Sequence, residues 1–112
     1  MDTHKPEILL IDVETVKKAL DEKDNLIILD VRTQAEYERG RIPSSINIPL
    51  DEIDSKVDTL TSDKNESLYI YCLSGSRSML AAEQLMNLGY KNIFNITNGL
   101  LAWKSHHYPI EN

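Results

Sequence analysis

The sequence predicts an α/β fold in which helices cover both faces of a mainly parallel sheet. Short apolar segments alternate along the chain with segments of helical periodicity, and this alternation is typical of parallel strands joined by right-handed crossovers. Residues 26–31 form an almost unbroken apolar run, as expected for a strand that is covered on both faces. With 112 residues, 41% of them hydrophobic, the chain suits a single domain over residues 1–112.

The first elements follow from a short apolar segment and a helix cap. Residues 8–11 predict a short strand after a loose N-terminus of residues 1–7. Asp12 can accept a hydrogen bond from an amide of the first helical turn, so it predicts a helix over residues 13–20. The apolar strand at 26–31 follows.

The next helix is predicted by a capping box. Thr33 and Glu36 have the spacing at which each side chain bonds the other residue's backbone amide. The helix should begin directly after Thr33 and end at Gly40, which can adopt the backbone conformation that terminates a helix. A brief strand at 45–48 and an acidic surface helix at 51–60 complete this half of the chain.

The C-terminal half continues the alternation. A polar loop at 61–67 precedes a strand at 68–71, and the next helical pattern spans 78–88 and stops at Gly89. Its predicted buried face consists of Ala81, Ala82, Leu85, Met86 and Leu88. The last elements are a strand at 92–96, a helix capped by Thr97 and Asn98 that runs to about Lys104 with Trp103 in the core, and a loose tail at 108–112.

Cys72 follows the strand at 68–71 and precedes a loop that leads into a helix. In a parallel sheet, such a loop directs backbone N–H groups and the helix dipole at one point, which favours an anion there. A thiol is a weak nucleophile at pH 7, and a fall of its pKa by about two units makes the thiolate its major form. We infer that Cys72 is a nucleophile. The alternative is a buried structural thiol.

The composition excludes several partners and sites. A formal net charge of −6 argues against nucleic acid and anionic membranes, and no apolar stretch approaches the roughly 18 residues of a membrane span. Because Cys72 is the single cysteine, an internal disulfide is excluded. We expect a cytoplasmic monomer, although a chain from which a leader had been removed would look the same. The histidines His4, His106 and His107 lack metal-ligand spacing, so no metal and no cofactor are expected.

Three motifs, in order along nearly the whole chain, carry a family resemblance. The first is the loop Tyr71-Cys72-Leu73-Ser74-Gly75-Ser76-Arg77-Ser78, and the second is Asn98-Gly99-Leu100-Leu101-Ala102-Trp103. The third lies upstream and consists of Leu29-Asp30-Val31-Arg32, Glu36-Tyr37, Gly40-Arg41-Ile42-Pro43 and Asn47-Ile48-Pro49. These motifs resemble the signature of the single-domain rhodaneses, the thiosulfate sulfurtransferases, in which the loop reads Cys-x-x-Gly-x-Arg-Ser and the second motif Gly-Gly-x-x-Ala-Trp.

The resemblance implies a rhodanese-like three-layer α/β/α domain with a mainly parallel five-stranded sheet. It also implies sulfur transfer: Cys72 takes the sulfane sulfur of a small anionic donor, thiosulfate or a persulfide, and holds it as a persulfide. An acceptor such as cyanide, a thiol or a thioredoxin-like protein then removes that sulfur. The predicted site consists of Cys72 as the catalytic residue, the substrate-binding residues Leu73, Ser74, Gly75, Ser76, Arg77 and Ser78, and the supporting residues Asp30 and Arg32.

Several roles within this loop stay open from the sequence. Arg77 could hold an anionic donor, or form an ion pair with Glu36 or Asp30. Gly75 could shape a ring-like loop through a positive φ or simply occupy a turn, and the serines could donate hydroxyls to the substrate or only cap the helix. Asp30 and Arg32 could order the loops or touch substrate.

At several positions this sequence differs from the residues that are common in the rhodanese family. Leu73 and Ser74 lack the positive charge of some thiosulfate-preferring rhodaneses, Arg41 stands where the family often has histidine, and Asn98 where it often has glycine.

Cys-x5-Arg phosphatases use a similar loop, but only four residues separate Cys72 from Arg77, and this shorter ring favours sulfur. A sulfur carrier and a non-enzymatic protein-binding module are the further alternatives.

Overall fold

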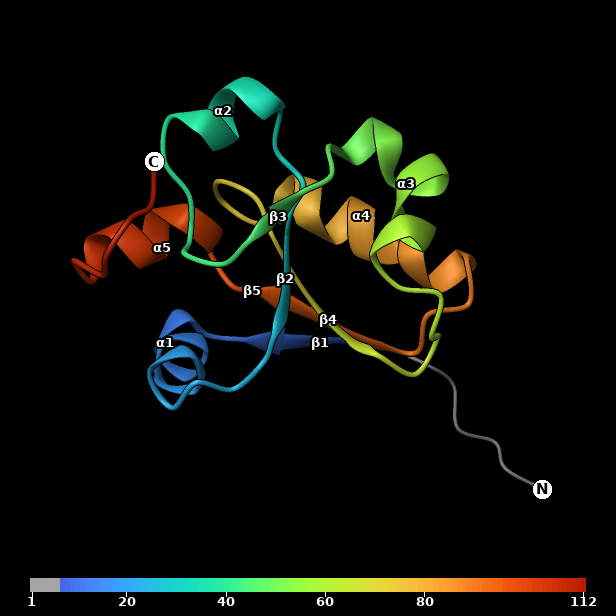
Figure 1. Cartoon of the computed structure of the whole chain (residues 1–112), viewed down its shortest axis with the longest axis horizontal. Helices are drawn as coiled ribbons and strands as arrows, with labels where there is room; N and C mark the ends of the chain where they lie inside the picture. The colour runs from blue at the N-terminus through green and yellow to red at the C-terminus, as the bar shows by residue number, and fades with distance from the viewer. Residues whose placement is uncertain (1–6) are drawn as a thin grey trace.

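A computed structural model describes residues 7–112, and its five strands form one sheet in which every neighbouring pair is parallel (Figure 1). The sheet order is β1-β5-β4-β2-β3, so the residue that follows β4 emerges in the middle of the carboxyl edge, where ligands bind in such sheets. The predicted five-stranded parallel sheet is confirmed. Its strands are β1 (Ile8–Ile11), β2 (Ile27–Asp30), β3 (Ile46–Asn47), β4 (Ser67–Tyr71) and β5 (Asn92–Ile96).

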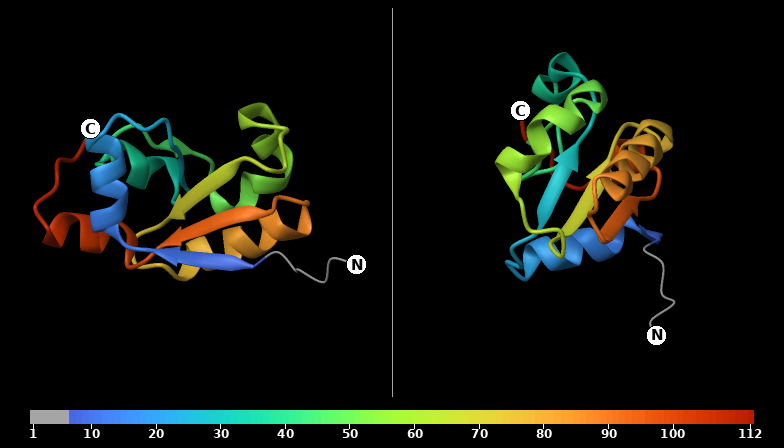
Figure 2. Two further views of the ribbon diagram at one scale, coloured as in Figure 1. Left: turned by 90° about the horizontal axis from the view of Figure 1, so that it is seen from below. Right: turned by 90° about the vertical axis from the view of Figure 1, so that its right-hand side faces the viewer.

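Helices cover both faces of the sheet, which confirms the three-layer α/β/α architecture (Figure 2). One face carries α3 and α4 and the other carries α1 and α5, as the composition of the two cores shows. The helices are α1 (Val13–Asp21), α2 (Gln34–Glu38), the 3-10 helix η1 (Leu50–Glu52), α3 (Ile53–Leu60), α4 (Ser76–Asn87) and α5 (Gly99–Ser105).

Each face of the sheet has its own hydrophobic core. Ile70 and Leu85 belong to the core under α3 and α4, and Cys72 lies in the same core. Ile28 and Trp103 belong to the core under α1 and α5, so the expected core position of Trp103 is confirmed. Because successive strand residues point to opposite faces, a strand between two cores is largely apolar on both faces.

Two of the three predicted helix caps form side-chain hydrogen bonds. The Asp12 carboxylate accepts a hydrogen bond from the Thr15 amide at 2.8 Å. At the start of α2, the Glu36 amide donates to the Thr33 hydroxyl at 3.2 Å and the Thr33 amide donates to the Glu36 carboxylate at 3.1 Å. The sequence signals at these two helix starts are therefore confirmed as local hydrogen bonds.

The start of α4 differs from the prediction. The helix begins at Ser76 and not at Ser78, so Arg77 lies in its first turn. The reason is Gly75, whose φ of +117° lets the chain turn from the strand end into the helix within the residues 73–75. At the other end of α4, Leu88 caps the helix and is 36% exposed, so its expected place in the buried face is wrong.

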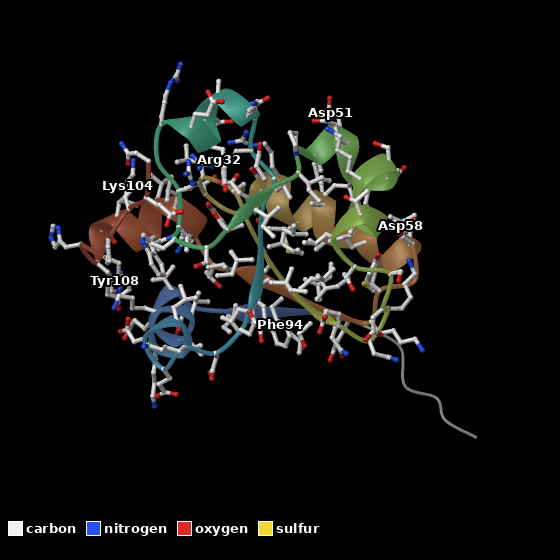
Figure 3. All side chains as sticks on the ribbon, in the orientation of Figure 1. Arg32, Asp51, Asp58, Phe94, Lys104 and Tyr108 are labelled. Carbon is white, nitrogen blue, oxygen red and sulfur yellow. The ribbon has the colours of Figure 1, made fainter. Side chains whose placement is uncertain are left out.

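The C-terminal tail is not loose, contrary to the expectation for residues 108–112. Arg41 and Glu111 exchange two backbone hydrogen bonds, at 2.9 and 3.0 Å, and the Trp103 indole donates to the Pro109 carbonyl at 2.8 Å. Tyr108, labelled in Figure 3, packs edge-on against Trp103. Arg41 stands where the family that this sequence resembles often has histidine. Its backbone therefore holds the end of the chain.

Residues 1–6 lie outside the described part of the chain, and with them His4 and most of the expected loose N-terminus. Glu7, the one described residue of that segment, is exposed. Within residues 7–112, no helix is both long enough and apolar enough to cross a bilayer.

Candidate active site

The loop after β4 curls around the sulfur of Cys72. The amide of Gly75 donates to Sγ at 3.0 Å and the amide of Ser78 donates at 3.4 Å. The Ser78 hydroxyl oxygen lies 3.5 Å from the same sulfur and accepts a hydrogen bond from the thiol. Because the two amides are fixed by the loop and by the first turn of α4, they form a cradle that favours a negative charge on sulfur.

The thiol of Cys72 is shifted toward ionisation despite its burial. Burial raises the pKa of the Cys72 thiol, but the hydrogen bonds from the Ser78 hydroxyl and from the amides of Ser78, Gly75 and Ser74 outweigh it. The pKa therefore lies below its ordinary value. Cys72 is only 1% exposed, so the sulfur is covered while the loop amides point at it.

The three serines of the loop differ in burial and in their contacts with Cys72. Ser78 is fully buried next to the sulfur, whereas Ser74 and Ser76 are exposed. In the part of the chain that the structure describes, the hydroxyls of Ser74 and Ser76 make no hydrogen bond with Cys72. Leu73 is 37% exposed and lies on the rim of the loop.

Arg77 forms an ion pair with Glu36 of α2. Two guanidinium nitrogens contact the two carboxylate oxygens at 2.7 and 3.1 Å, and both side chains are about one-third exposed, 35% and 28%. The hydrogen bonds from Arg77 lower the pKa of Glu36 to about 2. Of the two partners considered from the sequence, Glu36 and Asp30, the structure selects Glu36.

A cavity of about 300 Å³ lies beside Arg77. Its lining combines apolar side chains with the guanidinium and one carboxylate, and Cys72 is not part of it. The cavity therefore offers space next to the loop, without contact to Cys72. Its lining residues are Val31, Thr33, Pro49, Leu50, Asp51 and Arg77.

Asp30, the last residue of β2, and Arg32, labelled in Figure 3, form an ion pair at the carboxyl end of that strand. The Asp30 carboxylate accepts from the Arg32 amide at 2.9 Å and from its guanidinium at 2.6 Å. The guanidinium also donates to the Gly40 carbonyl at 2.7 Å. Asp30 is fully buried and Arg32 is 3% exposed, so these hydrogen bonds order the segment after β2 from inside the protein.

The first turn of α5 fixes the loop from the other side. The amides of Leu100 and Leu101 donate to the carbonyls of Cys72 and Leu73, both at 3.0 Å. This approach requires Gly99, because a Cβ there would lie 2.1 Å from the Cys72 carbonyl oxygen. Asn98 occupies the predicted N-cap position of α5, with a φ of +57° and no side-chain hydrogen bond.

The place of Asn98 in the loop still has a physical reason. Asparagine tolerates a positive φ better than other residues with a side chain. Asn98 can therefore stand where the family that this sequence resembles often has glycine. Its contribution is a backbone conformation and not a capping side chain.

Asn95 was missed as a site residue from the sequence. It lies in β5 and is 4% exposed, and its Oδ1 accepts a hydrogen bond from the Ser78 hydroxyl at 2.6 Å. The available signal was a polar residue inside an otherwise apolar strand, Ile93-Phe94-Asn95-Ile96. A buried polar side chain in such a strand needs a partner.

A metal site is not formed by the described residues. Within residues 7–112, no group of three or more His, Cys, Asp and Glu side chains is arranged to hold a metal ion. His106 lies 3.5 Å from the Glu14 carboxylate, on the surface.

Comparison with known proteins connects this geometry to a family. The sequence model of the rhodanese-like domain family matches residues 12–106 of this chain. The sulfurtransferase of Allochromatium vinosum is 34% identical over 100 residues, which are 89% of this chain and 92% of that protein. The Bacillus subtilis protein YrkF, named as a candidate sulfur carrier, is 38% identical over 83% of this chain, which spans about half (49%) of that relative.

A solved structure supports the same assignment. The thiosulfate sulfurtransferase of Pseudomonas aeruginosa superposes with a TM-score of 0.84 at 27% identity, over 94% of this chain and 20% of that longer one. The family match covers all three motifs and the loop around Cys72. The chain belongs to the rhodanese-like domain family, whose members here include sulfurtransferases.

Proposed function

We propose that this protein transfers a sulfane sulfur through a persulfide on Cys72. The observation that carries the proposal is the pair of amides, those of Gly75 and Ser78, at 3.0 and 3.4 Å from the Cys72 sulfur. These donors stabilise a thiolate before the reaction and a persulfide anion after it. The sulfurtransferase relatives support the same chemistry.

The reaction consists of two displacements on sulfur. In the first, the Cys72 thiolate attacks the outer sulfur of the donor. The donor's sulfur–sulfur bond breaks, and its remaining part leaves with the electron pair, as sulfite from thiosulfate or as a thiolate from a persulfide. In the second, an acceptor thiolate or cyanide attacks the outer sulfur of the persulfide, and the Cys72 thiolate leaves. Neither step needs an oxidant or a reductant.

The charges around the loop favour a persulfide donor over thiosulfate. Arg77 is the one basic residue among residues 72–78, and its guanidinium is already paired with Glu36. Leu73 and Ser74 add no positive charge. A thiosulfate dianion therefore gains little electrostatic attraction here. A persulfide of a small thiol or of a protein carries less negative charge and depends less on such attraction. We infer that such a persulfide is the preferred donor.

The burial of Cys72 has a consequence for this reaction. At 1% exposure, the sulfur is reached only when residues that cover it move. Residues 73–75 connect β4 to α4, and Leu73 and Ser74 are exposed. We infer that these residues move aside when a donor or an acceptor docks.

Mass spectrometry tests the proposal directly. Incubation with thiosulfate or with glutathione persulfide should add one sulfur, about 32 Da, that a reductant removes. Cys72→Ser should take up none, and Ser62→Ala, at an exposed position of the loop between α3 and β4, should take up as much as the native chain. Failure of the native chain to form the adduct with either donor would exclude the proposed function.

The remaining candidate functions make different predictions in turnover assays. An enzyme forms thiocyanate repeatedly from thiosulfate and cyanide, whereas a carrier holds one sulfur until a specific protein acceptor is supplied. A phosphatase would hydrolyse an aryl phosphate and show no sulfur adduct. The four-residue spacing between Cys72 and Arg77 and the pairing of Arg77 with Glu36 favour the sulfur chemistry.

A further inference from the structure

The Ser78 hydroxyl has three acceptors within reach but only one hydrogen. Its Oγ lies 2.6 Å from Asn95 Oδ1, 3.0 Å from the Gly75 carbonyl and 3.5 Å from the Cys72 sulfur. Ser78 is fully buried and Asn95 is 4% exposed, so each group depends on its protein partners. The shortest contact assigns the hydrogen to Asn95.

This arrangement suits a protonated Cys72. The thiol S–H points to Ser78 Oγ, and the Ser78 O–H points to Asn95 Oδ1, which gives a continuous chain of donors and acceptors. The sulfur is the first donor of that chain. Removing the proton from the sulfur therefore removes the first hydrogen bond of this series.

An ionised sulfur requires the opposite direction. A thiolate or a persulfide anion only accepts hydrogen bonds, so the Ser78 hydrogen must turn toward Cys72. Asn95 Oδ1 and Ser78 Oγ would then be two acceptors at 2.6 Å with no hydrogen between them, which is unfavourable in a buried site. A half-turn of the Asn95 amide removes this conflict, because Nδ2 then donates to Ser78 Oγ.

The surroundings of Asn95 permit that half-turn. The backbone of Asn95 is held between β4 and β1, opposite Ile70 and Leu10, so only the side chain needs to rotate. Within residues 7–112, Nδ2 makes no hydrogen bond that the rotation would break. An amide is both donor and acceptor, and a carboxylate at this position would only accept.

We propose that Asn95 is a positioning residue whose side-chain amide changes from acceptor to donor when Cys72 changes from thiol to thiolate or persulfide anion. Through Ser78, it supplies the hydrogen bond that each state of the sulfur needs. The proposal deepens the proposed function and rests on it only in taking Cys72 as the reacting group. It can be tested without any sulfur donor.

The test follows the rate of Cys72 alkylation by iodoacetamide against pH. Because Cys72 is the single cysteine, the reagent reports on this residue alone. In Asn95→Asp, the carboxylate keeps the Ser78 hydrogen away from the sulfur, and the midpoint should rise by about one pH unit. The control Asn92→Asp adds the same charge to an exposed position of β5 and should leave the midpoint within about 0.2 units.

A double variant separates the hydroxyl from a simple charge effect. If Asn95 acts through Ser78, Asn95→Asp should shift the midpoint in a Ser78→Ala background by less than half of its shift in the native background. An equal shift in both backgrounds, or no shift in the native one, would overturn the proposal. These results are independent of persulfide formation, whose absence would contradict the proposed function alone.

A measurement on the native chain covers the case in which Asn95→Asp does not fold. The side-chain amide resonances of Asn95 should change with the same pH midpoint as Cys72 alkylation. They should stay constant over that range in Cys72→Ser. Constant resonances in the native chain would show that the amide does not respond to the sulfur, and would overturn the proposal.

Discussion

The α-carbon of Gly99 lies so close to the carbonyl oxygen of Cys72 that a Cβ on Gly99 would stand 2.1 Å from it. This contact places the first amides of α5 on the carbonyls of Cys72 and Leu73. The sulfur loop is therefore held from two sides. The amides of Gly75 and Ser78 donate to the sulfur at the start of α4, and amides at the start of α5 donate to the two loop carbonyls. Neither contact involves a charged side chain.

Gly99→Ala should destabilise the protein by about 1–3 kcal/mol, because the new Cβ overlaps the Cys72 carbonyl and must displace the loop. Alkylation of Cys72 should also change its pH midpoint. Gly89→Ala is the matched control, since Gly89 has a φ of +102° but its Cβ would meet only the Lys64 side chain at 3.8 Å. Urea unfolding and alkylation kinetics measure both effects; equal behaviour of the two variants would contradict the role given to Gly99.

Removing the charge of Glu36 should improve the use of thiosulfate. In Glu36→Gln, Arg77 loses its anionic partner, and a unit charge in this partly exposed site is worth roughly 1 kcal/mol toward a dianion, or about fivefold in kcat/KM. Glu38→Gln on the same helix removes an equal charge that is bonded to Gln34 and not to Arg77, and it should have little effect. Loss of activity in Glu36→Gln would instead show that the ion pair is needed to hold the loop.

The same ion pair should affect stability at acid pH. The folded-state pKa of Glu36 is about 2, below its ordinary value of 4.5, so ionised Glu36 stabilises the fold at pH values above 4.5. This contribution is lost as the pH falls from 4.5 toward 2. The difference in the free energy of unfolding between the native chain and Glu36→Gln should therefore be constant near neutral pH and shrink over that range. A difference that does not depend on pH would rule out the ion pair as its source.

Alkylation of Cys72 in the native chain should show a midpoint below the ordinary pKa of 9.0 for a cysteine thiol. Ser78→Ala removes the hydroxyl that lies 3.5 Å from the sulfur and should raise the midpoint by roughly half a unit to one unit. Ser76→Ala, whose side chain is exposed, should not move it. A native midpoint above the ordinary value would mean that burial dominates over the hydrogen bonds.

Asp30→Asn should strongly destabilise the protein. It leaves the Arg32 guanidinium, 3% exposed, without a counter-charge, and breaking a buried pair in this way costs about 3–5 kcal/mol. Glu52→Gln breaks the exposed pair of Glu52 with Lys56 and should cost at most about 1 kcal/mol. Urea unfolding of the two variants compares them; similar small losses would show that water reaches Arg32.

Local signals in the sequence predicted most of the fold. The Thr33–Glu36 capping box and the Asp12 cap were predictable because their partners are three residues apart, so the local chain geometry fixes them. The start of α4 was misplaced by two residues because the turn depends on the backbone of Gly75, which the helical pattern does not encode. The C-terminal tail was misjudged because its partner, Arg41, lies on a distant segment.

The sequence by itself determined the order of strands and helices and the place of Cys72 at the head of a loop that enters a helix. Only the tertiary structure decided that Arg77 pairs with Glu36, 41 residues away, and that Asn95 meets Ser78 from β5. The physical reason is range. Periodicity and caps act within a few residues of the chain, whereas these contacts exist only once the sheet order has brought the ends of β2, β4 and β5 together.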